Sequence, residues 1–310
     1  MGFALAGASL DQLLERPRLR LPSAFTIFER LAAEGGLTMA ESSAGRFRRL
    51  TLDLWGGLRT FAMDLNEEST RRLIGCWLSE DPSGSDPGVF TNSRRRFLSL
   101  EDAQGASGLA SEATRALVDR YLGMGVLRRG LILQCSHCRL TDWYEMGQLG
   151  QSFECRRCRS RTLLTAGSWK GQANEPAFYY DLAEVAYQAL RNNVQVPVAA
   201  LYKLQSEAKS FLDLSEVELT NTEGTVVEID ILAIVDGRIV LGEVKTSDLV
   251  AKTNQGEMLW LQKFRSAAEA LTADEVVFAT AAPNWRKRTV EHIHTVFDDM
   301  NIVVRLLEQI

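Results

Sequence analysis

The sequence has no long hydrophobic run, no basic start of the kind that opens a signal peptide, and no lysine in its first half. No apolar stretch of the 310 residues approaches the roughly 18 that a membrane-spanning helix needs, so no membrane association is expected. The apolar segment Met1–Leu10 contains no basic residue, which argues against a secretory signal and favours a cytoplasmic protein. Hydrophobic residues make up 45 % and charged residues 24 % of the chain, proportions that exclude a disordered or fibrous protein.

Charge is unevenly distributed along the chain. Residues 1–169 contain 22 arginines, no lysine and 19 acidic residues, whereas the remainder contains 13 basic and 21 acidic residues. The formal net charge of −5 excludes a strongly basic nucleic-acid-binding protein as a description of the whole chain. Arginine suits phosphate contacts because its guanidinium is planar and always charged, although a genomic preference for arginine codons explains the excess equally well. The change in composition near residue 170 predicts a domain boundary.

Four of the five cysteines form two closely spaced pairs. Two residues separate Cys135 from Cys138 and Cys155 from Cys158, and 16 residues lie between the pairs. This spacing is typical of a structural zinc site, in which two turns direct four thiolates at one ion. Because four ligands leave no open position, we expect the zinc to support the fold and not to activate water. Paired redox-active thiols are the alternative interpretation.

Arginines surround the cysteine pairs. They are Arg139, Arg156, Arg157, Arg159 and Arg161. An arginine-bearing zinc ribbon can contact a phosphate backbone, but the same side chains can also offset the negative charge of a zinc ion held by four thiolates. The sequence leaves both interpretations open. The fifth cysteine, Cys76, lies in an apolar helical stretch, where we expect a buried thiol of the core.

Three domains are expected: a mostly helical region at residues 1–125, a four-cysteine zinc ribbon at 126–170 and an α/β domain at 171–310. The first region contains the predicted helices Ala24–Ala33, Thr70–Trp77 and Ser111–Met124, the last with Ser111 as its N-cap, and a predicted loop at Asp81–Gly88. The strand Leu127–Leu133 after the third helix gives a weak winged-helix-like pattern. In the last domain we expect helices at Asp181–Arg191, Gly256–Leu271 and Arg286–Met300, and strands at Val217–Leu219, Val226–Val235, Arg238–Val244, Val276–Ala279 and Ile302–Leu307. This αβββαβαβ order predicts a mixed sheet flanked by helices.

A hairpin brings charged residues together in the last domain. The dipeptide Asp236-Gly237 separates two β-branched runs, and it favours the two positive φ angles of a type I′ turn. A turn at these residues places Asp230 opposite Glu243 and Glu228 opposite Lys245, and alternation along each strand puts all four side chains on one face.

These charges are expected to form a metal site. Directly opposed carboxylates repel each other unless one is protonated or a cation lies between them. The neighbouring residues are Ile, Leu and Val, so an uncompensated charge among them costs several kcal/mol. A divalent cation such as Mg²⁺, which prefers oxygen ligands, resolves the conflict. A surface hairpin with two ion pairs in water is the alternative.

Asp230, twelve intervening residues and the tripeptide Glu243-Val244-Lys245 together resemble the motif of the PD-(D/E)XK nuclease superfamily. The resemblance covers the last domain and implies a restriction-endonuclease-like αβββαβ core. It implies that Asp230 and Glu243 bind Mg²⁺ or Mn²⁺ and that Lys245 assists attack on a phosphodiester. The proline of the motif is absent, and Glu228-Ile229-Asp230 stands in its place, a variant similar to the Mrr-like and Holliday-junction-resolvase-like branches. Those branches often add a glutamate before the strands and a glutamine after them, which by position implies catalytic roles for Glu184 and Gln262.

The sequence therefore predicts a metal-dependent endonuclease with DNA as the expected substrate and restriction or phage defence as the expected role. The expected cofactors are a structural Zn²⁺ and a catalytic Mg²⁺ or Mn²⁺. The expected partners are nucleic acid, a protein that supplies targeting, and a second copy of the chain. Two alternatives stay open: an RNA nuclease, whose metal chemistry is the same, and a non-catalytic adaptor that binds protein or nucleic acid through the zinc ribbon.

Overall fold

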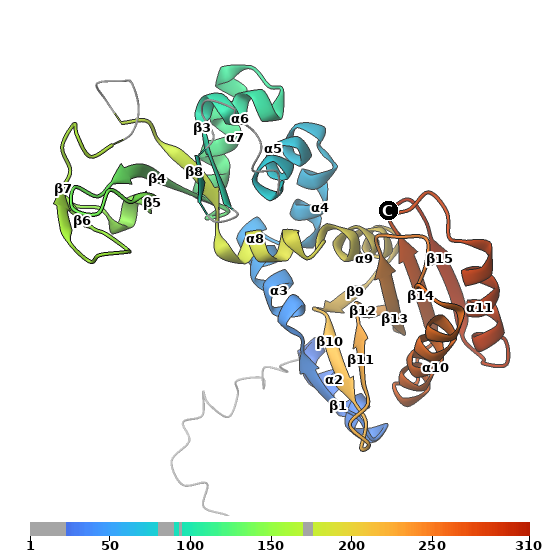
Figure 1. Cartoon of the computed structure of the whole chain (residues 1–310). Coiled ribbons are helices and arrows are strands. Elements are labelled where there is room, and N and C mark those ends of the chain that lie inside the picture. Colours follow the sequence, from blue (N-terminus) through green and yellow to red (C-terminus); the bar gives the residue numbers. More distant parts are fainter. Residues whose placement is uncertain (1–22, 80–89, 93–94, 170–175) are drawn as a thin grey trace, which may run out of the picture.

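The computed structural model describes residues 23–79, 90–92, 95–169 and 176–310, and it shows an α/β protein with mixed sheets and flanking helices (Figure 1). The segment Met1–Leu10 and the expected loop Asp81–Gly88 lie outside the described residues. Among the described helices, none combines the length and the apolar character needed to cross a membrane.

A five-stranded mixed sheet dominates the C-terminal half. Its order is β15 (Val303–Leu307), β14 (Glu275–Thr280), β13 (Arg238–Lys245), β12 (Ile231–Val235) and β9 (Phe211–Leu214). Strands β9, β12 and β13 run antiparallel, whereas β13, β14 and β15 run parallel. Helices α10 (Asn254–Ala270) and α11 (Lys287–Phe297) pack on one face, and α9 (Gln195–Glu207) packs on the other. Strand alternation makes both faces apolar, so the sheet is buried between helices.

The predicted hairpin turn is confirmed. Asp236 and Gly237 have φ angles of 51° and 81°, and the ladder between β12 and β13 runs from Val235–Arg238 to Ile231–Gly242. Gly242 is required at that position, because a Cβ there would lie 2.9 Å from the carbonyl oxygen of Val277 on β14. Asp230 immediately precedes Ile231 and Glu243 immediately follows Gly242, so the two acidic residues lie next to each other beyond the last ladder pair.

The prediction of one continuous strand over Val226–Val235 is wrong. The chain bends at Asp230, and β11 (Val226–Ile229) belongs to a separate antiparallel sheet with β10 (Val217–Thr220) and β1 (Thr38–Glu41). Glu228 consequently pairs with Glu218 and not with Lys245. The bend occurs where the carbonyl oxygen of Asp230 accepts a hydrogen bond from a buried arginine, Arg48.

The N-terminal helices pack on one another and on the central sheet through one apolar core. They are α3 (Ser43–Trp55), α4 (Leu58–Asn66), α5 (Glu68–Leu78), α6 (Leu100–Ser107) and α7 (Ser111–Gly123), and α2 (Ala24–Glu34) joins a second core under α10. Cys76 on α5 is half-buried at the edge of the first core. Ser111 is the first residue of α7 and not its N-cap, which is Ala110 without a side-chain hydrogen bond.

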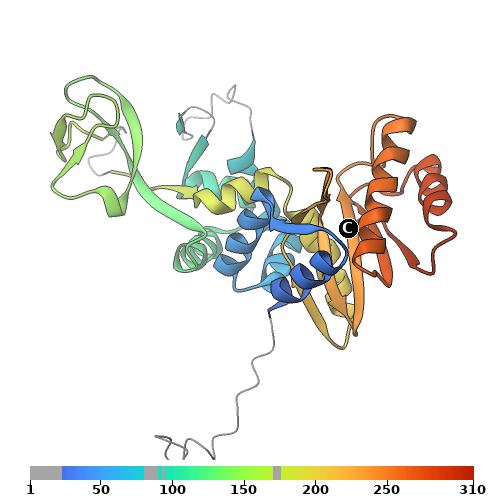
Figure 2. The same ribbon diagram turned by 90° about the horizontal axis from the view of Figure 1, so that it is seen from below.

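A third sheet connects the helical region to a separate lobe that contains the four paired cysteines (Figures 1 and 2). Its order is β2 (Phe90–Asn92), β3 (Arg95–Ser99), β8 (Tyr179–Leu182), β4 (Leu127–Gln134) and β5 (Thr141–Glu145). The lobe also contains the 3₁₀ turn η1 (Met146–Gln148) and the two-stranded sheet of β6 (Ser152–Glu154) and β7 (Arg161–Leu163). We call residues 127–169 the cysteine lobe.

The predicted helix Asp181–Arg191 is correct only in its second part, α8 (Glu184–Arg191). Residues 179–182 form β8, because this short segment bridges β3 and β4 with backbone hydrogen bonds on both sides. Strand β8 lies beyond residue 170, yet both its partners precede that residue. Hydrogen bonds thus cross the expected domain boundary, as they do where β1 pairs with β10.

Candidate functional site

The four paired cysteines form a compact cluster at the end of the cysteine lobe. Their Sγ atoms all lie within 4.8 Å of one another; Cys135 and Cys155 are buried, and Cys138 and Cys158 are half-buried. Sγ atoms from different pairs approach to 3.6 Å (Cys135–Cys158) and 3.5 Å (Cys138–Cys155). Four thiols in this arrangement could hold a metal ion such as zinc.

The two cysteine turns have the same backbone shape. Arg139 and Arg159, each directly after a pair, have φ angles of 62° and 60° and donate their N–H to the carbonyl oxygens of Cys135 and Cys155. Hydrogen bonds from the backbone N–H of Cys138 and the hydroxyl of Ser160 lower the pKa of Cys135 to about 5. A backbone hydrogen bond from Leu140 lowers the pKa of Cys138, but burial and the neighbouring cysteines outweigh it and raise that pKa to about 11. The four-sulfur geometry, and not these opposing shifts, is therefore what suits a metal ion such as Zn²⁺.

A second cluster lies at the end of the β12–β13 hairpin and contains the predicted residues Asp230, Glu243 and Lys245. Glu243, 3 % exposed, sits on the same face of the sheet as Leu241, and its carboxylate contacts the ammonium of Lys245. Asp230 Oδ2 accepts a hydrogen bond from the backbone N–H of Val244 at 2.7 Å. The carboxyl group of Asp230 is near enough to that of Glu243 to raise its pKa.

The pKa shifts in this cluster follow from burial and from the nearness of the carboxyl groups. Burial raises the pKa of Asp230, and the neighbouring Glu216 adds to the increase. Burial, followed by repulsion from Asp230, raises the pKa of Glu243 well above its usual range. Burial lowers the pKa of Lys245, but attraction to Glu243 and Asp230 outweighs it, so the net pKa is raised and the ammonium stays charged.

Two further carboxyl groups border this pair. The nearby carboxyl group of Glu216, followed by burial, raises the pKa of Glu228 to about 7. Glu216 also accepts a hydrogen bond from the hydroxyl of Ser42 at 2.6 Å. Carboxylate oxygens are the ligands that Mg²⁺ takes, but among the described residues only the four paired cysteines bring three or more metal-ligand atoms within 4.8 Å of one another.

Arg48 on α3 supports the cluster from the interior. It is 2 % exposed, and its guanidinium donates to the carbonyl oxygens of Asp230 (2.8 Å) and Leu214. The approach of α3 depends on Gly45, because a Cβ at this residue would lie 2.1 Å from the carbonyl oxygen of Glu216. Sequence reasoning missed Arg48 and Glu216. One signal exists for Arg48, which falls on the buried stripe of α3 with Thr51 and Trp55.

The carboxyl cluster opens into a cavity of about 200 Å³. Asp230, Glu216 and Lys245 form one wall, and Asn192 and Asn193, which connect α8 to α9, form another. The side chain of Lys245 is 32 % exposed, and its Nζ lies 5.7 Å from the ring centre of Trp260 on α10. A ligand that enters this cavity therefore meets Asp230, Glu216 and the ammonium of Lys245, whereas Glu243 is buried and does not line it.

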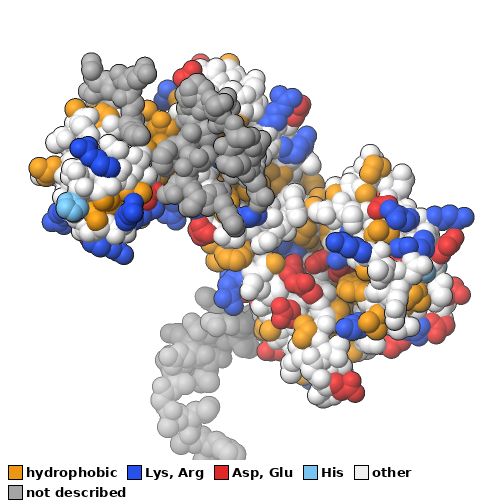
Figure 3. All heavy atoms as spheres, in the orientation of Figure 1, with side chains coloured by type: hydrophobic (Ala, Val, Ile, Leu, Met, Phe, Trp, Pro, Cys, Tyr) orange, Lys and Arg blue, Asp and Glu red, His pale blue; other side chains and the backbone are white. Residues whose placement is uncertain are grey.

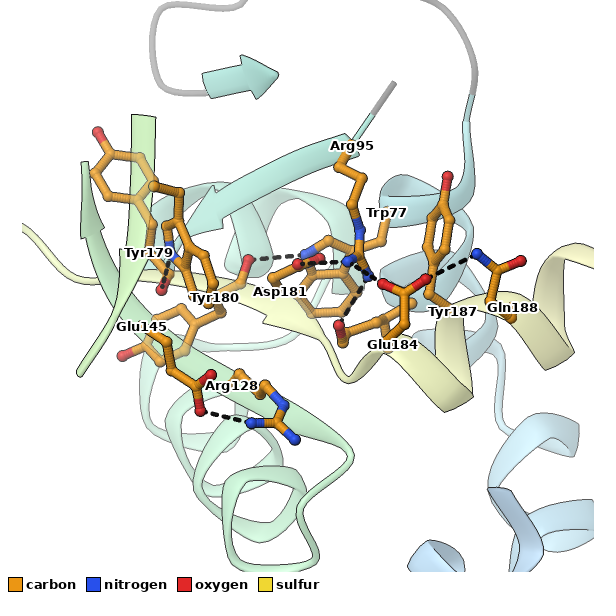
Figure 4. Close-up of polar contacts among 12 residues, drawn as sticks. Trp77, Arg95, Arg128, Glu145, Tyr179, Tyr180, Asp181, Glu184, Tyr187 and Gln188 are labelled. Atoms are coloured by element: carbon orange, nitrogen blue, oxygen red, sulfur yellow. Dashed lines mark hydrogen bonds and ion pairs between the residues drawn. The ribbon is translucent and has the colours of Figure 1, made fainter. Parts of the chain in front are cut away.

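The structure does not bring the two remaining predicted residues to this cavity. Gln262 lies on the exposed surface of α10. Glu184, the first residue of α8, accepts a hydrogen bond from Arg95 at 2.6 Å and lines a different cavity (Figure 4). Both were placed by position along the chain, which does not determine how a helix is rotated.

The surface charge is polarised. Residues 126–169 contain seven arginines and three acidic residues. Figure 3 shows Lys and Arg side chains around the cysteine lobe, whereas Asp and Glu side chains gather over strands β9–β12 on the same face of the molecule. Arg139, Arg157 and Arg161 are exposed. The basic lobe and the acidic cluster can therefore face one elongated ligand.

No protein-family model matches the chain, and no curated protein matches it. Among solved structures the chain is similar to protein VC1899 from Vibrio cholerae, with 13 % sequence identity and a TM-score of 0.37. The alignment covers 91 % of this chain and 57 % of that one, so the chain spans little more than half the length of VC1899.

Proposed function

We propose that this protein is a metal-dependent endonuclease with a PD-(D/E)XK-type site and that DNA is its substrate. The observation that carries the proposal is the grouping of Asp230, Glu243 and Lys245, in which Asp230 and Lys245 line the 200 Å³ cavity and the buried Glu243 pairs with Lys245. The order α9, β9, β12, β13, α10, β14 supports it, because three antiparallel strands and then a parallel strand after a helix form an αβββαβ unit. Its first helix and first strand are not the predicted Asp181–Arg191 and Val217–Leu219, and β10 and β11, which follow β9 in the chain, belong to a separate sheet.

The donor set fits a divalent cation. Asp230 and Glu243 would hold Mg²⁺ or Mn²⁺, and their raised pKa values reflect two carboxyl groups that need more positive charge than Lys245 supplies. When bound, such an ion supplies Lewis acidity that stabilises negative charge on a phosphate and acidifies water.

The protein groups have separable tasks in this proposal. Lys245 keeps its proton near neutral pH, so it donates a hydrogen bond to an oxygen of the scissile phosphate and does not act as a base. The N–H of Val244 fixes the orientation of the Asp230 carboxylate. The exposed arginines of the cysteine lobe hold the phosphate backbone at a distance from the site, and a zinc ion on the four cysteines keeps that lobe folded.

Cleavage assays test the proposal. The full chain is incubated with supercoiled DNA, linear duplex DNA and RNA, each with Mg²⁺, with Mn²⁺ and without a divalent ion. We expect DNA to be cut only with Mg²⁺ or Mn²⁺, and an Asp230→Asn chain purified in parallel to be inactive. Cleavage of RNA alone would replace DNA as the substrate. No cleavage under any condition would favour the adaptor interpretation.

A further inference from the structure

A second cavity, of about 540 Å³, lies between the cysteine lobe and the helical region. Its walls come from β3, β4, β5, β8 and α8, and the residues that form them do not include Asp230 or Lys245. This volume is within the range of about 300–1,000 Å³ that is usual for small-molecule sites. Figure 4 shows part of its polar lining, including Glu184, which the sequence had placed in the catalytic site.

Four arginines line this cavity; acidic or amide side chains fix three of them, and the fourth, Arg191, donates to the hydroxyl of Tyr187 at 3.4 Å. The four are Arg95, Arg128, Arg156 and Arg191. Arg95 donates to Glu184 (2.6 Å) and to the carbonyl oxygen of Leu182 (3.0 Å), while its Nε is buried without a hydrogen-bond acceptor (Figure 4). Arg128 pairs with Glu145 at 2.7 Å. A guanidinium has five N–H donors, so these contacts orient the guanidinium groups of Arg95 and Arg128 and leave other N–H donors for a ligand.

Flat aromatic rings form another part of the lining. The rings of Trp143 and Phe97 stack with 5.1 Å between their centres and 22° between their planes. The guanidinium of Arg95 lies 4.3 Å from the ring centre of Tyr187. The three rings are only 5–6 % exposed, so the planar surface that faces the cavity is the guanidinium of Arg95, whose side chain is 26 % exposed, and nucleobases also stack on such arginine planes.

Two aspartates complete the lining and contribute acceptors. Asp142 and Asp181 are each 4 % exposed, and Asp181 Oδ2 lies 3.5 Å from Arg95 Nη1. Burial raises the pKa of Asp181 to about 7, so part of the acidic charge is neutralised near neutral pH. The cavity thus offers donors, acceptors and a stacking surface, which a planar polar ligand with an anionic group requires.

We propose that this cavity binds a nucleotide, with its base against the guanidinium plane of Arg95 and its phosphate on the other arginines. The ligand is either an unpaired nucleotide within a nucleic-acid strand or a free nucleotide, because both carry the same base and phosphate groups. Only the first source rests on the proposed nuclease function.

Helix α8 connects the two cavities and favours the first source. Glu184, Tyr187, Gln188 and Arg191 occur at the spacing of one helix face, and all four line the second cavity. The helix ends at Arg191, and the next two residues, Asn192 and Asn193, line the catalytic cavity. Eight helical residues span about 12 Å, so a strand that leaves the catalytic cavity reaches the second one within a few nucleotides.

Binding measurements on the full Lys245→Ala chain, without Mg²⁺ or Mn²⁺, test this proposal independently of cleavage. The probes are a fluorescent single-stranded DNA, the same strand with abasic positions, its blunt duplex, and adenosine monophosphate. The double variant Arg128→Ala/Arg191→Ala removes two exposed arginines of the cavity. The double variant Arg30→Ala/Arg59→Ala removes two exposed arginines elsewhere and is the matched charge control.

We expect the single strand to bind more tightly than the duplex and to lose roughly 5- to 150-fold in affinity when it is abasic. The cavity variant should lose at least tenfold in affinity while the control keeps its affinity. Binding of adenosine monophosphate without binding of the strand would assign the cavity to a free nucleotide. Equal affinities for the two double variants, or no binding of either ligand, would overturn the proposal.

Discussion

Arg48 determines the position of Asp230 through a contact that spans 182 residues of the chain. A cation buried this deeply is costly, and burial accordingly lowers the pKa of its guanidinium. Its compensation comes from two backbone carbonyls and from the nearby acidic residues Asp213 and Glu216. Arg48 is thus a positioning residue beneath the carboxyl cluster, because it contacts the backbone of Asp230 and not a ligand.

We expect Arg48→Met to lower the free energy of unfolding by about 3 kcal/mol, since it leaves two buried carbonyls and an acidic cluster without their cation. Urea denaturation measures this loss, and calorimetric titration with Mn²⁺ should show weaker binding. Arg49→Met on the same helix is the matched control, because Arg49 forms only a half-exposed pair with Glu41. Equal stability and equal Mn²⁺ affinity of the two variants would contradict this role.

Asp181 should make the stability of the protein depend on pH. Its pKa is about 7 in the folded chain and near 3.8 in the unfolded chain, so the folded state keeps a proton that the unfolded state loses. The associated stability is fully present below about pH 4 and is lost as the pH rises through 7. The Asp181→Asn variant should therefore be less sensitive to pH between 4 and 8, and more stable than the wild type at pH 8. Thermal unfolding of both proteins across this range checks it, and parallel curves would refute it.

At the scale of single residues, the sequence predicts those contacts that follow from the pairing of two neighbouring strands. Asp230, Glu243 and Lys245 come together because one turn, Asp236-Gly237, fixes the pairing of two adjacent strands. Arg48 could not be placed, because no local pattern relates α3 to a strand end far along the chain. The break at Asp230 was missed for the same reason, since Val226–Val235 has uninterrupted strand propensity and only the tertiary contact bends it.

The two cysteine turns act as one element only if a metal ion joins them. The cysteine lobe has a small apolar core of its own, formed by Leu131, Leu133, Tyr144 and Phe153. Short strands such as β6 and β7 are marginal without further support, so metal binding and folding should be coupled in this lobe.

We expect one zinc per chain by elemental analysis and less than one in Cys135→Ser. In that variant, hydrogen exchange should accelerate in β6 and β7 and around the cysteine turns. The amides of β12 and β13 should keep their protection, because their sheet has a separate core. Protein purified without chelators that contains no zinc would contradict the assignment.

Most of the helices and strands that were predicted are present, but others, among them α3, α4, α9 and β9, were not predicted. Asp181 and Leu182 were assigned to a helix, although residues 179–182 form β8 through hydrogen bonds to β3 and β4. Those partners lie 45 or more residues earlier in the chain. Periodicity within a window cannot detect such pairing.

At the scale of the whole molecule, the N-terminal region completes the carboxyl-bearing half. Strand β1 extends the β10–β11 sheet, Ser42 binds Glu216, and Arg48 binds Asp230. The composition therefore changes near residue 170 in its charge, while strands from both sides of that residue pair with each other. The arrangement joins a basic lobe to an acidic site on one face, which the proposed nuclease function would use to hold a nucleic acid (Figure 3).

Residues 171–310 alone should consequently fail to form a cooperative unit. They would lack β1 beside β10, both partners of β8, and Arg48 beneath Asp230. Circular dichroism should show a broad thermal transition and calorimetry a loss of Mn²⁺ binding, both restored in the full chain. A sharp transition together with full Mn²⁺ affinity in the fragment would show that the domain is independent.

The single-turnover rate of DNA cleavage by Lys245→Ala tests the central claim most directly. Lys245 does not hold the metal ion in this account, so the variant should bind Mn²⁺ nearly as the wild type does. It should cut about 10²- to 10⁴-fold more slowly, because an electrostatic group at the scissile phosphate is lost. Lys252→Ala, which removes an exposed lysine outside the catalytic cavity, should cut at the wild-type rate. If Lys245→Ala cleaves as fast as the wild type on every substrate that the wild type cuts, the site has been assigned incorrectly and the adaptor interpretation holds.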